Sequence, residues 1–96
     1  MINIGLYYKT KPGKEKEFEE TFKGVVEKLK SSGVVIDAKL YKEIGGDSQY
    51  MIYSEWKDLD SLRNFMQSKE FSETTNRGKS IIDGIPRHRV FSELKE

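Results

Sequence analysis

The stretch YMIYSEWKDLDSLRNFM, residues 50–66, decides the fold of this chain. Its first half is rich in aromatic residues and predicts a strand, residues 49–56, which ends on the only tryptophan, Trp56. Asp58 stands where a helix N-cap belongs, and the apolar residues behind it recur on one helix face: Leu59, Leu62, Phe65 and Met66. This junction places a large indole at the rim of the space between a sheet and a helix, where a small domain can hold a flat ligand.

The chain before this stretch begins with a strand and a long helix. Residues 2–9 alternate between two faces, as a strand does. After a break at Pro12 and Gly13, apolar residues recur at helical spacing among lysines and glutamates: Phe18, Phe22, Val25, Val26 and Leu29. Gly33 stands where a helix C-terminal cap belongs.

A hairpin links this helix to the tryptophan strand. Residues 34–43 predict its first strand, and the alternation turns one set of side chains toward the core: Val34, Ile36, Ala38 and Leu40. The sequence Gly45-Gly46-Asp47 predicts the turn, because glycine tolerates the positive φ angles that hairpin turns need. The strands 34–43 and 49–56 are therefore expected to pair in antiparallel fashion.

The last third of the chain predicts a further helix and a closing strand. The helix, residues 70–83, carries an apolar stripe with large ends and a small middle: Phe71, Thr74, Thr75, Gly78, Ile81 and Ile82. Gly84-Ile85-Pro86 ends it, and residues 87–94 predict a strand. The order β-α-β-β-α-β, with the second helix split, predicts an α+β, ferredoxin-like fold with an antiparallel sheet and helices on one face.

Composition and charge exclude several classes of function. The 96 residues supply one core, so we expect a single domain over residues 1–96. A net charge of +1, from 17 basic and 16 acidic side chains, gives no field for a nucleic acid backbone or an anionic membrane. The absence of cysteine excludes disulfides and thiolate chemistry. With no signal peptide or membrane-spanning stretch in the sequence, we expect a cytoplasmic protein.

The strands carry a second apolar face, on the side away from the expected helices. The strand alternation places six apolar or aromatic residues on this face: Tyr7, Val35, Tyr41, Met51, Tyr53 and Phe91. Such a face is too apolar and aromatic to remain in water. A second copy of the chain, packed sheet to sheet, would cover it, and we therefore expect a homodimer.

The elements together resemble the antibiotic biosynthesis monooxygenase superfamily, chiefly in the run YSEWKDLDSLRNFMQSKEF and the closing GIPRHRVF. The resemblance spans essentially the whole chain and implies a dimeric α+β barrel with a pocket between the sheet and the helices of each subunit. The superfamily includes cofactor-independent monooxygenases that oxidise polycyclic phenols to quinones, and heme-degrading monooxygenases.

The resemblance also bears on heme. The heme-degrading members use an asparagine in the first strand, a tryptophan in the second helix and a histidine one helical segment later. These positions fall on Leu6, on Phe65 and on or near Thr75. None of the three is kept, and a threonine cannot serve as the proximal iron ligand. The resemblance therefore argues against heme degradation, and we expect no cofactor.

The candidate substrate-binding residues surround the expected pocket: Leu6, Trp56, Phe65, Thr74, Thr75 and Gly78. Trp56 would form a wall against a planar ring, although a tryptophan at such a corner commonly serves packing alone. The small residues of the last helix would leave a gap over the sheet. Alternatively, they would let helix and sheet approach each other closely.

Two residues are candidates for catalysis. His88 is the only histidine and would act as the general base for a phenolic proton, or else would protect a sheet edge from unwanted strand pairing. The strand alternation places Tyr8 on the sheet face that the helices cover, where it would donate a hydrogen bond inside the pocket. A lone histidine without other ligands at suitable spacing predicts no metal site.

These observations favour a cofactor-independent monooxygenase that oxidises an electron-rich aromatic substrate, a phenol or an anthrone, with O2. Such chemistry requires an apolar pocket, hydrogen bonds to an oxyanion and a base, but no bound metal or nucleotide. The alternatives are a non-catalytic dimer that binds a small apolar ligand, and a protective or scaffolding dimer with a vestigial pocket.

Overall fold

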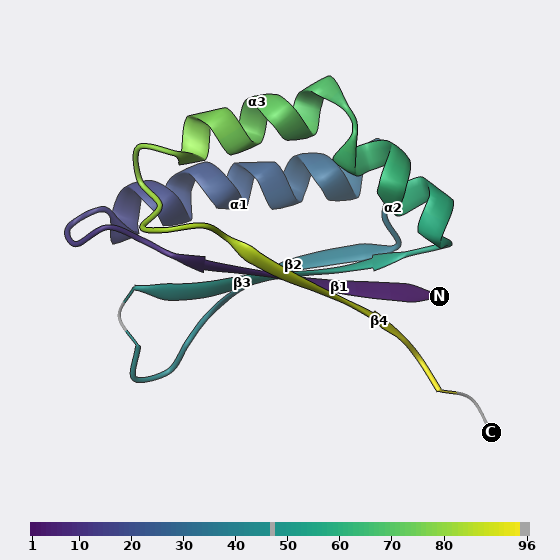
Figure 1. Cartoon of the computed structure of the whole chain (residues 1–96), viewed down its shortest axis with the longest axis horizontal. Helices are drawn as coiled ribbons and strands as arrows, with labels where there is room; N and C mark the ends of the chain where they lie inside the picture. Colours follow the sequence, from purple (N-terminus) through teal and green to yellow (C-terminus); the bar gives the residue numbers. More distant parts are fainter. Residues whose placement is uncertain (47, 95–96) are drawn as a thin grey trace.

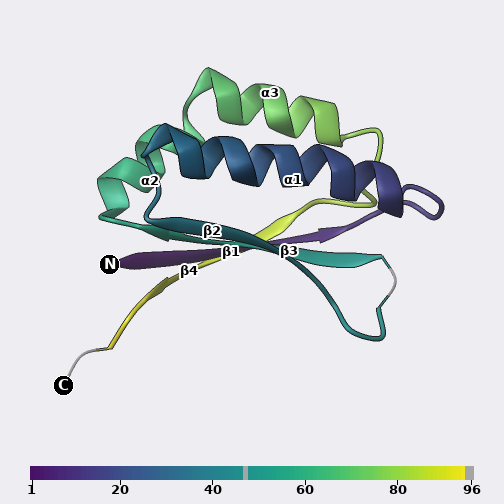
Figure 2. The same cartoon turned by 180° about the vertical axis from the view of Figure 1, so that it is seen from behind.

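The computed structural model of the chain describes residues 1–46 and 48–94. Its elements in chain order are β1 (Ile2–Lys9), α1 (Glu15–Ser32), β2 (Asp37–Lys42), β3 (Gln49–Trp56), α2 (Leu59–Met66), α3 (Lys69–Gly78) and β4 (Arg87–Ser92). The strands form one antiparallel sheet in the order β2-β3-β1-β4. Figures 1 and 2 show all three helices above one face of this sheet and none on the other. The expected α+β ferredoxin-like fold is confirmed.

The core lies between the sheet and the helices, and its largest fully buried side chains are aromatic: Trp56, Phe18 and Phe22. Phe18 and Phe22, one helical turn apart on α1, stack with their centroids 4.4 Å apart. Phe18 also meets Tyr50 of β3 at 4.5 Å. Trp56, at the end of β3, is 1% exposed, and its Nε1 donates a hydrogen bond to the Ser54 hydroxyl at 2.9 Å. The indole is thus buried with its polar atom satisfied.

The helix ends follow from the sequence. The Asp58 carboxylate accepts a hydrogen bond from the Ser61 amide at 2.8 Å and caps α2, which also holds the pKa of Asp58 below its usual range. The Ser68 hydroxyl caps α3 in the same manner. Gly33 ends α1 with φ of 78°, the left-handed conformation that glycine adopts without strain. The capping signals at residues 33 and 58 are therefore confirmed.

The expected phase of the second strand is wrong at its beginning. β2 starts only at Asp37, and Val35 is buried while Val34 and Ile36 are 48% and 53% exposed. Residues 34–36 form a bend after the helix cap, so the strand alternation does not extend back through them. Of the predicted hairpin turn, Asp47 lies outside the described residues.

The last helix is shorter than the sequence predicts, because α3 ends at Gly78. Ile81 and Ile82 are buried nonetheless, in the turn that follows the helix. This turn is held by β1 and the loop after it: Lys11 N donates to Ile81 O at 2.9 Å, and Asp83 N donates to Lys9 O at 2.7 Å. The backbone of residues 81–83 therefore pairs with the end of β1 instead of extending the helix.

Gly78 is a close-packing position. A Cβ at this residue would lie 2.9 Å from Ile82 Cδ1 and 3.5 Å from Phe22 Cζ. Gly24, in the middle of α1, is the opposite case, because a Cβ there would meet nothing within 4 Å. The two helical glycines thus offer a matched pair, one in a filled space and one in an open space.

We expect Gly78→Leu to destabilise the fold by about 1–3 kcal/mol, because the new side chain overpacks the contact with Phe22 and Ile82. Gly24→Leu should instead stabilise it by about 0.5–1 kcal/mol, because a better helix former replaces glycine without a clash. Urea unfolding of both variants measures the difference. An unchanged free energy of unfolding for Gly78→Leu would show that this space is open.

Candidate functional site

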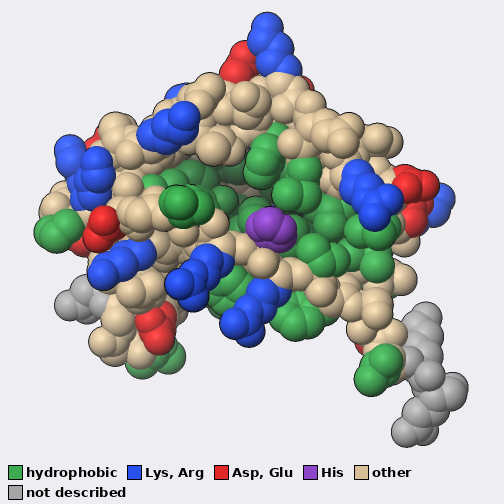
Figure 3. All heavy atoms as spheres, in the orientation of Figure 1, with side chains coloured by type: hydrophobic (Ala, Val, Ile, Leu, Met, Phe, Trp, Pro, Cys, Tyr) green, Lys and Arg blue, Asp and Glu red, His purple; other side chains and the backbone are tan. Residues whose placement is uncertain are grey.

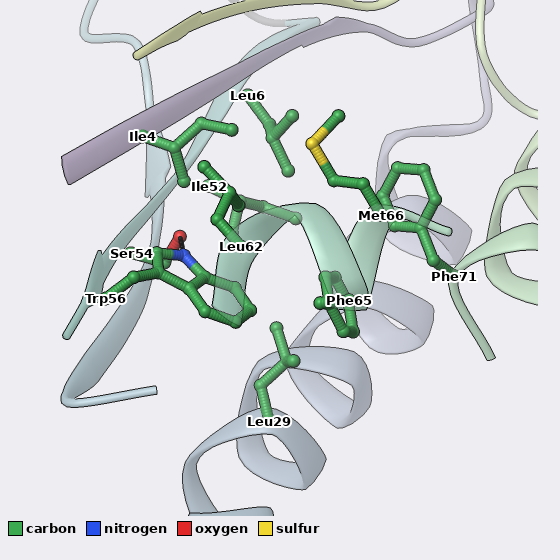
Figure 4. A pocket seen from close by; sticks show the side chains of 10 residues that line it. All are labelled: Ile4, Leu6, Leu29, Ile52, Ser54, Trp56, Leu62, Phe65, Met66 and Phe71. Carbon is green, nitrogen blue, oxygen red and sulfur yellow. Dashed lines mark hydrogen bonds between the residues drawn. The ribbon is translucent and has the colours of Figure 1, made fainter. Parts of the chain in front are cut away.

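A small apolar cavity lies between the sheet and the helices, beside Trp56. Its volume is about 20 Å³, and ten residues from β1, β3, α1, α2 and α3 line it: Ile4, Leu6, Leu29, Ile52, Ser54, Trp56, Leu62, Phe65, Met66 and Phe71 (Figure 4). This volume holds about one water molecule, since a water needs roughly 10–15 Å³. The cavity as it stands is therefore too small for an aromatic ring.

Three aromatic rings form one wall of the cavity. The centroid of Trp56 lies 5.2 Å from that of Phe65, and Phe65 lies 5.4 Å from Phe71 in an edge-on arrangement. The only polar lining side chain is Ser54, whose hydroxyl accepts the Trp56 N–H. Leu6, Trp56 and Phe65, three of the predicted substrate-binding residues, thus meet around one water-poor space.

His88 lies on the helix side of β4, an edge strand, directly beside Leu6 of β1. It is exposed, as is the whole of β4. Figure 3 shows the single histidine, in purple, among hydrophobic side chains, with a hollow above it under the helices. His88 is therefore next to the cavity lining at Leu6, but its side chain is in contact with solvent.

Tyr8 points to the helix side of the sheet and packs against α1. Its ring centroid lies 5.6 Å from Phe18 and 5.3 Å from Phe22. Burial raises the pKa of Tyr8 to about 12, so the phenol keeps its proton at neutral pH. Tyr8 can donate a hydrogen bond but cannot act as a base there, and it lies outside the cavity lining.

The small residues of α3 do not floor this cavity. The Thr75 hydroxyl is exposed and donates to the Phe71 carbonyl at 2.9 Å, while Gly78 packs against Phe22 and Ile82. Thr74 lines a different space, a groove of about 810 Å³ on the outer side of the helices. The missing volume that the sequence indicates in α3 thus faces α1 and not the sheet.

This groove is the feature that sequence reasoning missed. Its lining comes from α1, α2, α3 and the adjoining loops, and includes Thr21, Gly24, Val25, Lys28, Asn64, Thr74 and Arg77. The sequence feature that could have indicated the groove is Gly24. A glycine in the middle of a long helix lowers the stability of the helix, so its presence suggests that a side chain is unwanted at that position. Leu29 and Phe65 line both the groove and the inner cavity, so they separate the two.

The donor set around the cavity does not suit a metal. In residues 1–46 and 48–94, no group of three or more histidine, aspartate or glutamate side chains gathers where it could hold an ion. The same part of the chain contains no helix long and apolar enough to cross a membrane.

Comparison with known proteins agrees with this architecture. A protein from Halobacterium salinarum, named "putative heme-binding protein", is 29% identical over 85 residues; these cover 88% of this chain but only 17% of that protein. The Bacillus subtilis protein named "putative monooxygenase YcnE" is 24% identical over 96 residues and matches both chains over their full length.

Among solved structures, SnoaB, a cofactor-independent oxygenase from Streptomyces nogalater, superposes with a TM-score of 0.83 at 17% identity. The match covers 99% of this chain and 94% of that one, and it shows a shared fold. The family model of antibiotic biosynthesis monooxygenases matches residues 1–77, from the first strand almost to the end of α3. The chain therefore belongs to the antibiotic biosynthesis monooxygenase family.

Proposed function

We propose that this chain is a cytoplasmic, single-domain, dimeric monooxygenase that oxidises an electron-rich aromatic substrate with O2 and without a cofactor. The observation that carries the proposal is the aromatic-lined cavity at Trp56, in a chain of a monooxygenase family. An anthrone is a suitable substrate class: its CH2 group becomes a carbonyl, one oxygen atom enters the product, and the other leaves as water with the two hydrogens. The substrate supplies the electrons, so the protein needs only to bind, deprotonate and shield it.

The residues take the following roles in this proposal. Trp56 and Phe65 stack on the ring system, and Leu6 lies against its edge. His88 removes a proton from the CH2 group of an anthrone, or from the hydroxyl of a phenol, when that group faces the open side of β4. Tyr8 lies outside the present lining and is protonated at neutral pH, because burial raises its pKa to about 12; it donates to the oxyanion once the cavity has widened along β1 to reach it.

The cavity must widen before a ring can enter. Gly78 is the only buried residue of α3, and Phe65, Met66 and Phe71 of the cavity wall are only half-buried. Movement of α3 and the end of α2 away from the sheet opens the space, and the bound ring then covers the face of Trp56 that Phe65 leaves.

Oxygen uptake with a panel of phenols and anthrones tests the activity. We expect turnover without added cofactor, and His88→Gln should lower kcat by about 100-fold or more if His88 is the base. Lys16→Glu, a charge change on the exposed side of α1, is the matched control and should leave kcat unchanged. Ligand-induced stabilisation in thermal melts without oxygen uptake would instead favour a non-catalytic binder of small apolar ligands.

Heme does not fit the site, although several relatives carry heme-binding in their names. No histidine lines the cavity, so it offers no axial ligand to a heme iron. At the three positions that the heme-degrading members use, this chain has no suitable side chain. Leu6 and Phe65 are hydrocarbon side chains that line the cavity, and the Thr75 hydroxyl donates a hydrogen bond to the Phe71 carbonyl.

We therefore expect no productive heme chemistry. Adding heme and a reductant should give no spectrum of an axial histidine ligand and no loss of the Soret band. Conversion of heme to a linear tetrapyrrole would contradict this expectation.

The proposed dimer packs the two open sheet faces together. On this face Tyr7, Tyr41 and Phe91 are 38%, 44% and 50% exposed, a large aromatic area for a monomer to leave in water. The same face holds a polar chain in which Asn3 Nδ2 donates to the Tyr53 hydroxyl, and this hydroxyl donates to Glu55 at 2.8 Å. The Oδ1 atom of Asn3 is buried within the subunit and has no hydrogen-bond partner among the described residues.

Tyr53→Glu should dissociate the dimer. The substitution places a carboxylate beside Glu55 on the same face, where burial without a partner is costly. Sedimentation at micromolar concentration should show two chains for the parent and one for the variant, with Lys16→Glu as the control for an added acidic charge. A parent protein that sediments as a monomer would contradict the dimer.

A further inference from the structure

The groove outside the helices is a second candidate site, separate from the cavity at Trp56. Its volume of about 810 Å³ lies within the range of small-molecule pockets, which hold roughly 300–1,000 Å³. Along α1 it extends from Thr21 to Ser32, about 16 Å at the rise of an α-helix. At the Gly78 end α1 and α3 come together, because Phe22 lies against this glycine. The groove is thus closed at one end, and its volume suits a small molecule.

The groove exists because small side chains stand where helices usually interlock. Gly24 of α1 presents no side chain to it, and a Cβ there would meet no atom within 4 Å. Thr74 of α3 lines it as well. Val25, Leu29 and Phe65 give it an apolar floor and are all half-buried, so a ring placed on them would remove apolar surface from water.

Three cations, Lys28, Lys57 and Arg77, line the groove together with two carboxylates, Glu70 and Glu73. Lys28 and Arg77 line it, and neither forms an ion pair in the part of the chain that the structure describes. Of its two carboxylates, Glu73 pairs with Lys69 at 3.9 Å, and Glu70 lies in the first turn of α3, where the helix dipole favours an acidic residue. The unpaired Lys28 and Arg77 remain to attract an anion.

We propose that this groove binds an aryl carboxylate. The ring lies on Val25, Leu29 and Phe65, and the carboxylate meets the basic rim at Lys28 and Arg77. Thr21, Thr74 and Asn64 line the same groove and can hydrogen-bond further oxygen atoms of the ligand. Binding here does not require the oxygen chemistry proposed for the inner cavity.

Titration of the 15N-labelled protein with 2-naphthoate tests the site, because amide shifts report where the ligand lies. The largest shifts should fall on Gly24, Lys28 and Thr74. 2-Naphthamide, the uncharged match, should bind about threefold more weakly or worse at low salt, as expected for contacts with exposed cations. The double variant Lys28→Gln, Arg77→Gln should remove this difference.

Gly24→Leu fills the groove without touching the core and should weaken naphthoate binding by about tenfold or more, since the leucine occupies the space of the ring. Gly24→Ala is the matched control and should bind as the parent does. Unchanged binding in Gly24→Leu, shifts confined to the open sheet face, or no binding of naphthoate would overturn the site. Equal binding of the amide and the acid would overturn its preference for an anion. Oxygen uptake is measured separately, so failure of either proposal leaves the other standing.

Discussion

The burial of Trp56 at the junction of β3 and α2 is the constraint on which the rest of the structure depends. The indole is almost fully buried, and its N–H can be buried because Ser54, two residues earlier on the same face, accepts it. This arrangement sets where β3 ends and directs α2 across the sheet through the Asp58 cap. Phe65 of α2 packs against the indole, and Phe71 of α3 packs against Phe65. These ring contacts position α3 relative to α2.

The same aromatic chain explains why the two spaces in the molecule differ so much in size. On the sheet side of Phe65 the large rings nearly fill the space and leave about 20 Å³. On its outer side α1 and α3 face each other with Gly24 and Thr74, and about 810 Å³ remains open. Phe65, which is half-buried, and Leu29 separate a small apolar cavity from a large amphipathic groove.

Much of the fold could be predicted from the sequence, because periodicity and caps are local signals. The strand ending at Trp56, the cap at Asp58 and the left-handed glycine at residue 33 all follow from side chains within a few positions. The phase of residues 34–36 did not, since a bend after a helix cap resets the alternation without a strong sequence mark.

The candidate site could be predicted only in part. Leu6, Trp56 and Phe65 do line one cavity, as strand parity and helical spacing indicate. The direction in which Thr74 faces depends on how α3 packs against α1, and this is a contact between distant parts of the chain. The stripe from Phe71 to Ile82 was expected to form one helix face, but the hydrogen bonds of residues 81–83 to β1 and its loop end the helix at Gly78.

The exposure of β4 on both faces has a consequence for how proteins with this architecture diverge. A residue such as His88 or Phe91 contributes little to the core, so a replacement there is nearly neutral for folding in the isolated subunit. Selection on this strand can therefore act on what the protein binds, largely free of the need to keep the fold. New specificities can arise along β4 while Trp56 and its neighbours stay the same.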